Sequence, residues 1–335
     1  MEPKQTTDTQ TAELMEQILY EVKRVVVGQD RFLERVMVAM LAQGHLLVEG
    51  VPGLAKTLTI KTLANTIRGN FKRIQFTPDL VPADLVGTRI YNQKTGEFGT
   101  SLGPVFTNLL LADEINRAPA KVQSALLEVM QERQVTIAGE THRVPEPFLV
   151  MATQNPIETE GTYPLPEAQV DRFMMKVLVD YPTDEEEFVI VQRVTGPTVT
   201  ANPVASTEQL AQLQATCRKV YVDPSLIQYA VRLVSATRTP EKHDLKDLRR
   251  FITYGASPRA TINLTEAARA LAMLRGRTYV LPQDMSDLVP DVFRHRLVLS
   301  YEALSEGLSA DNIIAKIMAR IPAPPKPLEH EALAA

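Results

Sequence analysis

The chain has 335 residues, a length that predicts two or three domains, and its formal net charge of −4 gives no overall attraction to nucleic acid or to an anionic membrane. Hydrophobic residues make up 44% of the chain and charged residues 23%, which is the balance of a folded globular protein. A single cysteine excludes an internal disulfide bond. The polar N-terminus lacks the apolar core of a signal peptide and no apolar run approaches the length of a membrane span, so we expect a cytoplasmic protein with no membrane insertion.

The chain begins with a polar segment followed by two helical patterns. Residues 1–10 are predicted to form a disordered tail, and apolar residues at helical spacing predict a helix over residues 12–26. The pattern breaks at Val27 to Gln29, after which Asp30 can cap a second helix. A turn in this position either packs in the core alone or lies beside the base of a bound nucleotide.

A glycine-rich turn lies between an apolar run at residues 45–49 and a helical pattern at residues 56–67. Its residues are Gly50, Val51, Pro52, Gly53, Leu54, Ala55, Lys56 and Thr57. A strand, a glycine-rich turn, Lys-Thr and a helix in this order predict a phosphate-binding loop. Lys56 would reach the β- and γ-phosphates, and the Thr57 hydroxyl would bind Mg²⁺. Ala55 stands where such a loop usually has glycine.

Strand-like and helix-like runs alternate between residues 45 and 180. Strands are predicted at residues 45–49, 71–76, 109–113, 147–153 and 174–180, and helices at residues 56–67 and 119–132. This alternation predicts a parallel sheet with helices on both faces, which binds its ligands at the carboxyl ends of the strands. Two segments do not fit the alternation and predict hairpins, one within residues 86–106 and one at residues 134–144.

Two carboxylates follow the apolar residues of the third predicted strand. A buried parallel strand is apolar along its length and exposes charge only at its end, which is where Asp113 and Glu114 stand. Asp113 would hold Mg²⁺ through water molecules, and Glu114 would take a proton from an attacking water molecule. Asn155 follows the next strand, where its amide would orient that water molecule or contact the γ-phosphate. An asparagine before a proline is also ordinary turn chemistry.

Two arginines are candidates for contact with phosphate. Arg172 precedes the last predicted strand, where it would either stabilise a transferring phosphoryl group or pair with a neighbouring acid. Arg259 lies in the first turn of a predicted helix, where a cation opposes the helix dipole and a bound phosphate would offset that effect. A salt bridge or an exposed position is the alternative for each of them.

The pattern becomes mostly helical after residue 206. Helices are predicted at residues 207–219, 224–238, 258–275, 282–295 and 309–320. We therefore expect a linker at residues 196–206, an all-helical domain at residues 207–321 and a tail at residues 322–335.

Taken together, these motifs resemble those of the MoxR-type AAA+ ATPases. The resemblance covers residues 12–320. It rests on the segments Glu49–Thr57, Gln75–Leu80, Gly99–Phe106, Asp113–Ala118, Ala152–Pro156 and Leu165–Phe173. The Gly-Leu-Ala-Lys-Thr sequence of the loop is similar to the one that the family uses, which accounts for Ala55.

The resemblance implies a fold and a set of site residues. The fold would be a P-loop NTPase core of the AAA+ type at residues 11–195, with a five-stranded parallel sheet, and an all-α lid at residues 207–321. Residues 86–106 would be the helix-2 insert, and residues 134–144 the pre-sensor hairpin. Asn155 would be sensor 1, Arg172 the arginine finger that reaches the neighbouring subunit, and Arg259 sensor 2 from the lid. The nucleotide-binding residues would be Val27, Gly28, Gln29, Gly50, Val51, Pro52, Gly53, Leu54, Ala55, Lys56, Thr57, Leu58 and Asp113, with Thr57 and Asp113 also holding Mg²⁺.

The resemblance also implies a function. The chain would hydrolyse ATP to ADP and phosphate within a homo-oligomeric ring, commonly a hexamer, and would remodel or mature partner proteins in the manner of a chaperone. Typical partners contain a von Willebrand factor A domain. One alternative is a nucleic-acid motor of a related AAA+ clade, although the insert offers only Arg89 and Lys94 against Glu97 for binding phosphates. A second alternative is the ATPase subunit of a magnesium chelatase-like complex.

Overall fold

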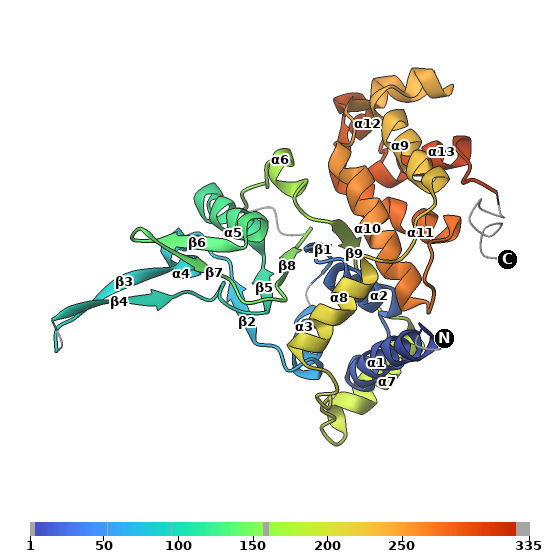
Figure 1. Ribbon diagram of the computed structural model, residues 1–335. Coiled ribbons are helices and arrows are strands. Elements are labelled where there is room, and N and C mark those ends of the chain that lie inside the picture. Colours follow the sequence, from blue (N-terminus) through green and yellow to red (C-terminus); the bar gives the residue numbers. More distant parts are fainter. Residues whose placement is uncertain (1–3, 52, 95, 157–160, 326–335) are drawn as a thin grey trace. The chain divides into compact units, whose positions relative to one another are not determined.

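The computed structural model describes residues 4–51, 53–94, 96–156 and 161–325, which form two compact units (Figure 1). The first unit takes its described residues from Met1–Val36, His45–Arg172 and Val177–Leu213. The second takes them from Met37–Gly44, Phe173–Lys176 and Gln214–Ala335. None of the helices among these residues is long and apolar enough to cross a membrane.

A five-stranded parallel sheet organises residues 45–180, as the sequence predicts. Its strand order is β2-β5-β8-β1-β9. The strands are β1 (Leu46–Glu49), β2 (Phe71–Gln75), β5 (Leu109–Asp113), β8 (Leu149–Gln154) and β9 (Met175–Leu178). The chain leaves β1 for the far edge at β2, returns through β5 and β8, and then passes β1 to reach β9. This change of direction places a crevice for ligands at the carboxyl end of β1.

The central strands are apolar because both faces of the sheet are covered. The first four residues of β5 and the first five of β8 are buried, and burial decreases only at Asp113 and Gln154. A residue with a charged or amide side chain is therefore found at the end of each strand, on the same edge of the sheet. The helices before α9 are α1 (Lys4–Val25), α2 (Asp30–Leu41), α3 (Lys56–Thr66), α4 (Pro82–Val86), α5 (Ala120–Glu132), α6 (Glu167–Val170), α7 (Asp184–Thr195) and α8 (Thr207–Cys217).

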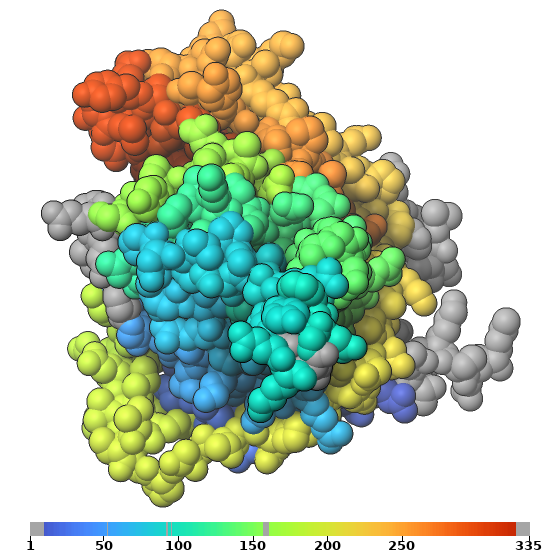
Figure 2. Space-filling model, turned by 90° about the vertical axis from the view of Figure 1, so that its left-hand side faces the viewer, coloured from blue at the N-terminus to red at the C-terminus, as the bar shows by residue number. Residues whose placement is uncertain are grey.

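Two hairpins extend from the first unit, at the segments where the sequence predicts them. Strands β3 (Gly87–Asn92) and β4 (Glu97–Leu102) form one, and β6 (Gln134–Ile137) and β7 (Glu140–Arg143) form the other. Figure 2, which looks onto this side of the molecule, shows both at the surface. Each hairpin pairs residues that are close in the sequence, which explains why local composition and alternation were sufficient to predict them.

The second unit is mostly helical, with one small sheet that the sequence did not predict. Its helices after α8 are α9 (Pro224–Arg238), α10 (Pro258–Leu274), α11 (Pro282–Phe293), α12 (Tyr301–Ser305) and α13 (Ala310–Arg320). The two-stranded sheet joins β10 (Ile252–Tyr254) to β11 (Val298–Leu299). Strands of two or three residues carry too short a pattern to be recognised in a sequence. The buried Arg296 donates hydrogen bonds to the carbonyl groups of Phe173 (2.6 Å) and Met174 (3.2 Å), which groups that segment with this unit.

The chain termini and the linker differ in part from the prediction. A disordered tail was expected at residues 1–10, but α1 already begins at Lys4, because helix formation continues from the apolar face that is buried further along the same helix. No helix or strand lies between Thr195 and Thr207, where the linker was expected. The division between the compact units nevertheless falls later, after Leu213. Most of the predicted C-terminal tail lies outside the described residues.

One buried histidine gives the stability of the fold a pH dependence. His45 accepts a hydrogen bond from the Val150 N–H (3.0 Å) at Nδ1, and its Nε2 faces the Met130 carbonyl at 3.1 Å. Burial, with a contribution from the charge of Arg133, lowers the pKa of His45 to about 3. The neutral ring is therefore the form that the fold requires.

We expect the free energy of unfolding to fall as the pH decreases from 6.5 towards 4. In this range the unfolded His45 binds a proton and the folded one does not, which costs up to about 1.4 kcal/mol per pH unit. Urea unfolding at several pH values should show this slope in the wild type and a smaller slope in His45→Asn. Equal slopes in the two proteins would assign the pH dependence to other groups.

Candidate functional site

The loop after β1 forms a left-handed turn at the start of α3. Gly53 has φ +88° and Ala55 has φ 54°, so the chain makes two left-handed steps before the helix begins. A Cβ on Gly50 would lie 2.6 Å from the Val179 carbonyl oxygen, so this position requires glycine. No side chain caps the N-terminus of α3, where the residue before the helix is Ala55. The positive end of the helix dipole and its free N–H groups are therefore available to a bound anion.

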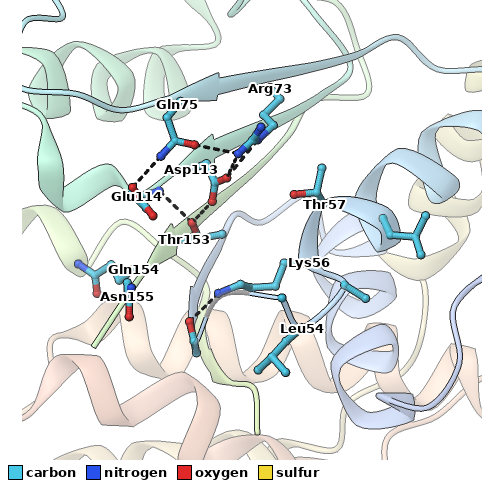
Figure 3. Close-up of a pocket in the computed structure, with 14 residues that line it drawn as sticks. Leu54, Lys56, Thr57, Arg73, Gln75, Asp113, Glu114, Thr153, Gln154 and Asn155 are labelled. Carbon is cyan, nitrogen blue, oxygen red and sulfur yellow. Dashed lines mark hydrogen bonds and ion pairs between the residues drawn. The ribbon is translucent and has the colours of Figure 1, made fainter. Parts of the chain in front are cut away.

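This loop lines a cavity of about 430 Å³, a size suited to a small-molecule ligand. The other walls come from the carboxyl ends of β2, β5 and β8 (Figure 3). The lining residues are Gly50, Gly53, Leu54, Ala55, Lys56, Thr57, Leu58, Arg73, Gln75, Asp113, Glu114, Thr153, Gln154 and Asn155. The topology thus brings together residues from four separate strand ends, as expected for the edge of a parallel sheet.

The Lys56 side chain lines the cavity and reaches back to the first residue of the loop. Its Nζ donates a hydrogen bond to the Gly50 carbonyl at 2.6 Å. Burial lowers the pKa of Lys56, while the nearby charges of Asp113 and Glu114 act in the opposite direction. A partly desolvated ammonium group interacts more strongly with an anion than one in water does. Thr57, the next residue, also lines the cavity, with its hydroxyl turned towards the interior (Figure 3).

Asp113 has a partner on each of its carboxylate oxygens. Oδ1 accepts a hydrogen bond from the Thr153 hydroxyl at 2.5 Å. Oδ2 accepts two from Arg73, one from Nε at 3.1 Å and one from Nη2 at 2.6 Å. The carboxylate is therefore fixed in orientation, and its direction towards the cavity does not depend on a bound ligand.

Glu114 is held by its backbone and by its side chain. It adopts the left-handed conformation with φ 55° and ψ 52°, which is costly for a residue with a Cβ and is found preferentially at functional sites. Its N–H donates to the Thr153 hydroxyl oxygen at 2.9 Å. Its Oε2 accepts from Gln75 at 2.7 Å and from Arg117 at 3.2 Å. The left-handed turn presents two consecutive carboxylates to the same cavity, which a continuous strand would send to opposite faces.

Comparison with known proteins agrees with this geometry. Residues 45–175 match the ATPase family associated with various cellular activities (AAA), and residues 247–317 match the AAA lid domain. The chain is 54% identical to "Chaperone MoxR1" of Mycobacterium tuberculosis over 310 residues, covering 92% of this chain and 82% of that one. It is 34% identical to "Protein MoxR" of Paracoccus denitrificans, covering 90% and 93%. A crystal structure from Cytophaga hutchinsonii has a TM-score of 0.90 and 47% identity, covering 95% and 97%. The chain belongs to the MoxR family of AAA+ ATPases.

Most of the site residues predicted for this MoxR-family chain lie in the cavity. The loop residues from Gly53 to Leu58, together with Gly50, Asp113, Glu114 and Asn155, all line it. Asn155 is buried at the end of β8, and Val51 is not among the lining residues. Pro52 lies outside the described residues.

A second, smaller cavity of about 100 Å³ shares the loop with the first. Val27 and Gln29 line it, together with Leu54, Ile190 and Val194 among others. The side-chain amide of Gln29 donates to the Asp180 carbonyl at 2.9 Å. The cavity is largely apolar in its lining and shares Gly53, Leu54, Ala55 and Leu58 with the larger one.

Gly28 differs from its two neighbours, because it is not among the lining residues of this cavity. It has φ +67°, and a Cβ there would lie 2.6 Å from the carboxylate of Glu186 on α7. The positive φ favours glycine at this position, whereas the end of the flexible Glu186 side chain could move away from a Cβ. A direct contact between Gly28 and a base stays a prediction.

The two predicted arginines are outside the lining of the first cavity. Arg172 donates a hydrogen bond from Nη1 to the Leu127 carbonyl of α5 at 3.1 Å. Arg259 belongs to the second unit, in the first turn of α10, where its N–H donates to the Ser257 hydroxyl oxygen at 3.2 Å. Their roles towards nucleotide stay predictions.

Four lining residues, Arg73, Gln75, Thr153 and Gln154, had no role in the sequence prediction. Arg73 and Gln75 lie on β2, and Thr153 lies on β8 between the two carboxylates and the sheet. Thr153 and Gln154 carry a signal in the sequence, since they are polar residues at and just after the end of the strand predicted at residues 147–153, and Gln75 lies one residue before the end of the strand predicted at residues 71–76. Arg73 is recognised only through the side chains that it contacts.

Proposed function

We propose that this chain binds ATP with Mg²⁺ in the larger cavity and hydrolyses it to ADP and phosphate. The observation that carries the proposal is the uncapped N-terminus of α3, with Lys56 beside it, in the same cavity as Asp113 and Glu114. The first pair attracts a polyphosphate, and the second pair provides an oxygen ligand for a hard cation and a general base. The smaller cavity, lined by Val27, would accept the base.

The residues present fit Mg²⁺. Thr57 and Asp113 offer the hydroxyl and carboxylate oxygens that this ion prefers, and both line the cavity. Within the described ranges there is no group of three or more His, Cys, Asp or Glu side chains that could hold a metal ion, so most ligands would come from phosphates and water. Bound Mg²⁺ supplies charge neutralisation of the phosphates.

The chemistry of the chain's own groups is proton transfer and orientation. Glu114 is held in a left-handed turn that places its carboxylate in the cavity. In this position the carboxylate would accept a proton from the attacking water molecule. Asn155, buried at the same edge of the sheet, would orient this water molecule through its amide group. Lys56 would leave the Gly50 carbonyl and bind the β- and γ-phosphates.

We further propose that the chain works as a homo-oligomeric ring, a hexamer, that remodels partner proteins. Support comes from the family, whose relative in Mycobacterium tuberculosis is named as a chaperone. A partner with a von Willebrand factor A domain and a cytoplasmic location are parts of the same proposal. A nucleic-acid motor and a chelatase subunit have weaker support, since high identity over most of the chain is to MoxR proteins.

The proposal is tested by phosphate release from ATP by the purified chain, together with its mass by light scattering. We expect release with Mg²⁺, none with EDTA, and a mass that is a multiple of the chain when nucleotide is present. Absence of both nucleotide binding and phosphate release would refute the proposed activity.

We expect Arg172→Ala to reduce hydrolysis while preserving nucleotide binding. In the proposed ring, Arg172 stabilises charge on the γ-phosphate of the neighbouring subunit, which is worth about 10³-fold in turnover. Mixing the variant with wild type tests this, because each variant subunit should also inactivate the site of a wild-type neighbour.

Arg143→Ala is the control, because Arg143 is an exposed arginine of β7 that does not line the cavity, and its removal should leave hydrolysis unchanged. A loss of activity in proportion to the fraction of Arg172→Ala subunits would show that Arg172 acts on its own subunit's site. That outcome would exclude the assignment to the neighbouring site.

A further inference from the structure

We propose that Arg73 occupies the metal-binding carboxylate when the site holds no metal, so that Mg²⁺ must displace its guanidinium group. This inference rests on the proposed function of the cavity. It concerns Arg73, a residue of β2 that is not in the phosphate loop and does not follow from the sequence motifs.

The contact has the geometry of a cation bound to a carboxylate. Two nitrogens of Arg73, Nε and Nη2, converge on the same oxygen of Asp113, at 3.1 and 2.6 Å. The other oxygen of Asp113 already accepts the Thr153 hydroxyl. Oδ2 thus accepts two hydrogen bonds and Oδ1 one, so a metal ion that approaches Oδ2, with or without an intervening water molecule, competes with Arg73 for this oxygen.

Exposure makes the contact reversible. The Asp113 side chain is 17% exposed, whereas that of Arg73 is 48% exposed. A half-exposed guanidinium group can return to water at small cost, since ion pairs at the surface contribute little to stability. The carboxylate, in contrast, stays at the strand end within the cavity. Arg73 therefore has the properties of a displaceable counter-ion rather than of a fixed structural partner.

The same arginine is connected to the proposed base. Its Nη2 also donates to the Gln75 side-chain oxygen at 2.8 Å, and the Gln75 amide donates to Glu114 Oε2 at 2.7 Å (Figure 3). When Arg73 leaves Asp113, its hydrogen bond to the Gln75 side-chain oxygen would also be lost. The state of the metal site is thereby communicated to Glu114 through two hydrogen bonds.

The test measures how strongly Mg²⁺ improves nucleotide binding, without any turnover. The dissociation constant of fluorescent ADP is determined in EDTA and in Mg²⁺, and the ratio of the two is the metal effect. We expect Arg73→Gln to increase this ratio by about two- to five-fold, because Asp113 is free to meet the metal. The value in EDTA should change less than the value in Mg²⁺.

Three further variants make the result specific. Lys72→Gln removes the same charge from the neighbouring exposed position of β2 and should leave the ratio unchanged. Arg73→Lys, which keeps the charge without the fork of two nitrogens, should give an intermediate ratio. In an Asp113→Asn background, Arg73→Gln should have no effect on the ratio, because the proposed competition takes place at Asp113.

Two outcomes would overturn the inference while leaving the proposed function intact. One is a ratio in Arg73→Gln that equals or falls below that of the wild type, which would mean that Arg73 is neutral or assists the metal complex. The other is an equal increase in the Asp113→Asn background. A wild-type protein that binds no nucleotide in either buffer would instead overturn the proposed function, and this inference with it.

Discussion

Replacement of Lys56 with alanine is expected to weaken nucleotide binding by about 30-fold or more, the effect of removing one partner from a partly buried, hydrogen-bonded charge pair. The ammonium group of Lys56 lies in the loop whose backbone would hold the phosphates, and burial of this group increases its interaction with an anion. Titration with fluorescent ADP and ATP measures the effect, and hydrolysis should be lost with binding.

Lys61→Ala is the matched control for this substitution. Lys61 lies on the same helix, α3, is exposed and does not line the cavity, so its removal changes the net charge equally without changing the site. Thermal unfolding of both variants without nucleotide should stay close to that of the wild type. Near wild-type affinity in a folded Lys56→Ala protein would mean that phosphates do not bind at this loop.

The sequence predicted the sheet and its ligand edge because both depend on local patterns. Strand β5 is apolar up to Asp113 and β8 up to Thr153, and the polar residues at the ends of these strands mark the carboxyl edge. The glycine-rich loop has a fixed length and a fixed context. The sequence therefore predicts that Asp113, Glu114 and Lys56 belong to one site, and the cavity contains all three.

The contacts of the side chains could not be predicted in the same way. Arg73 and Lys72 are adjacent cations on one strand, and both are exposed. Only the register of β2 against β5, which pairs Arg73 with Leu111 and Gln75 with Asp113, brings the first of them to the carboxylate. This pairing joins residues about forty positions apart, and a single sequence gives the order of strands more readily than it gives their register.

The conformation of Glu114 could not be predicted from the sequence either. A pair of acids after an apolar strand would ordinarily point to opposite faces, since side chains alternate along a strand. The left-handed turn at Glu114, with its N–H bonded to the Thr153 hydroxyl, turns both acids to one cavity. The residue that fixes this turn lies on another strand, so the local pattern contained no sign of it.

Glu114→Gln is expected to bind ATP within a few-fold of the wild-type affinity and to hydrolyse it about 10²- to 10⁴-fold more slowly, the usual effect of removing a general base. Glutamine has nearly the same shape and can still accept hydrogen bonds from Gln75 and Arg117, so the loop and the left-handed turn should be preserved. It cannot accept a proton from water. Single-turnover hydrolysis and nucleotide titration measure the two properties separately.

The same variant provides the strongest test of partner remodelling. If the ring holds its partner in the ATP state, then Glu114→Gln should retain a specific protein in ATP and release it in ADP. Glu128→Gln is the control, because Glu128 is an exposed residue of α5 that does not line the cavity. Unchanged turnover in Glu114→Gln would remove Glu114 as the base, whereas slow turnover without a retained protein would count against remodelling and leave the ATPase intact.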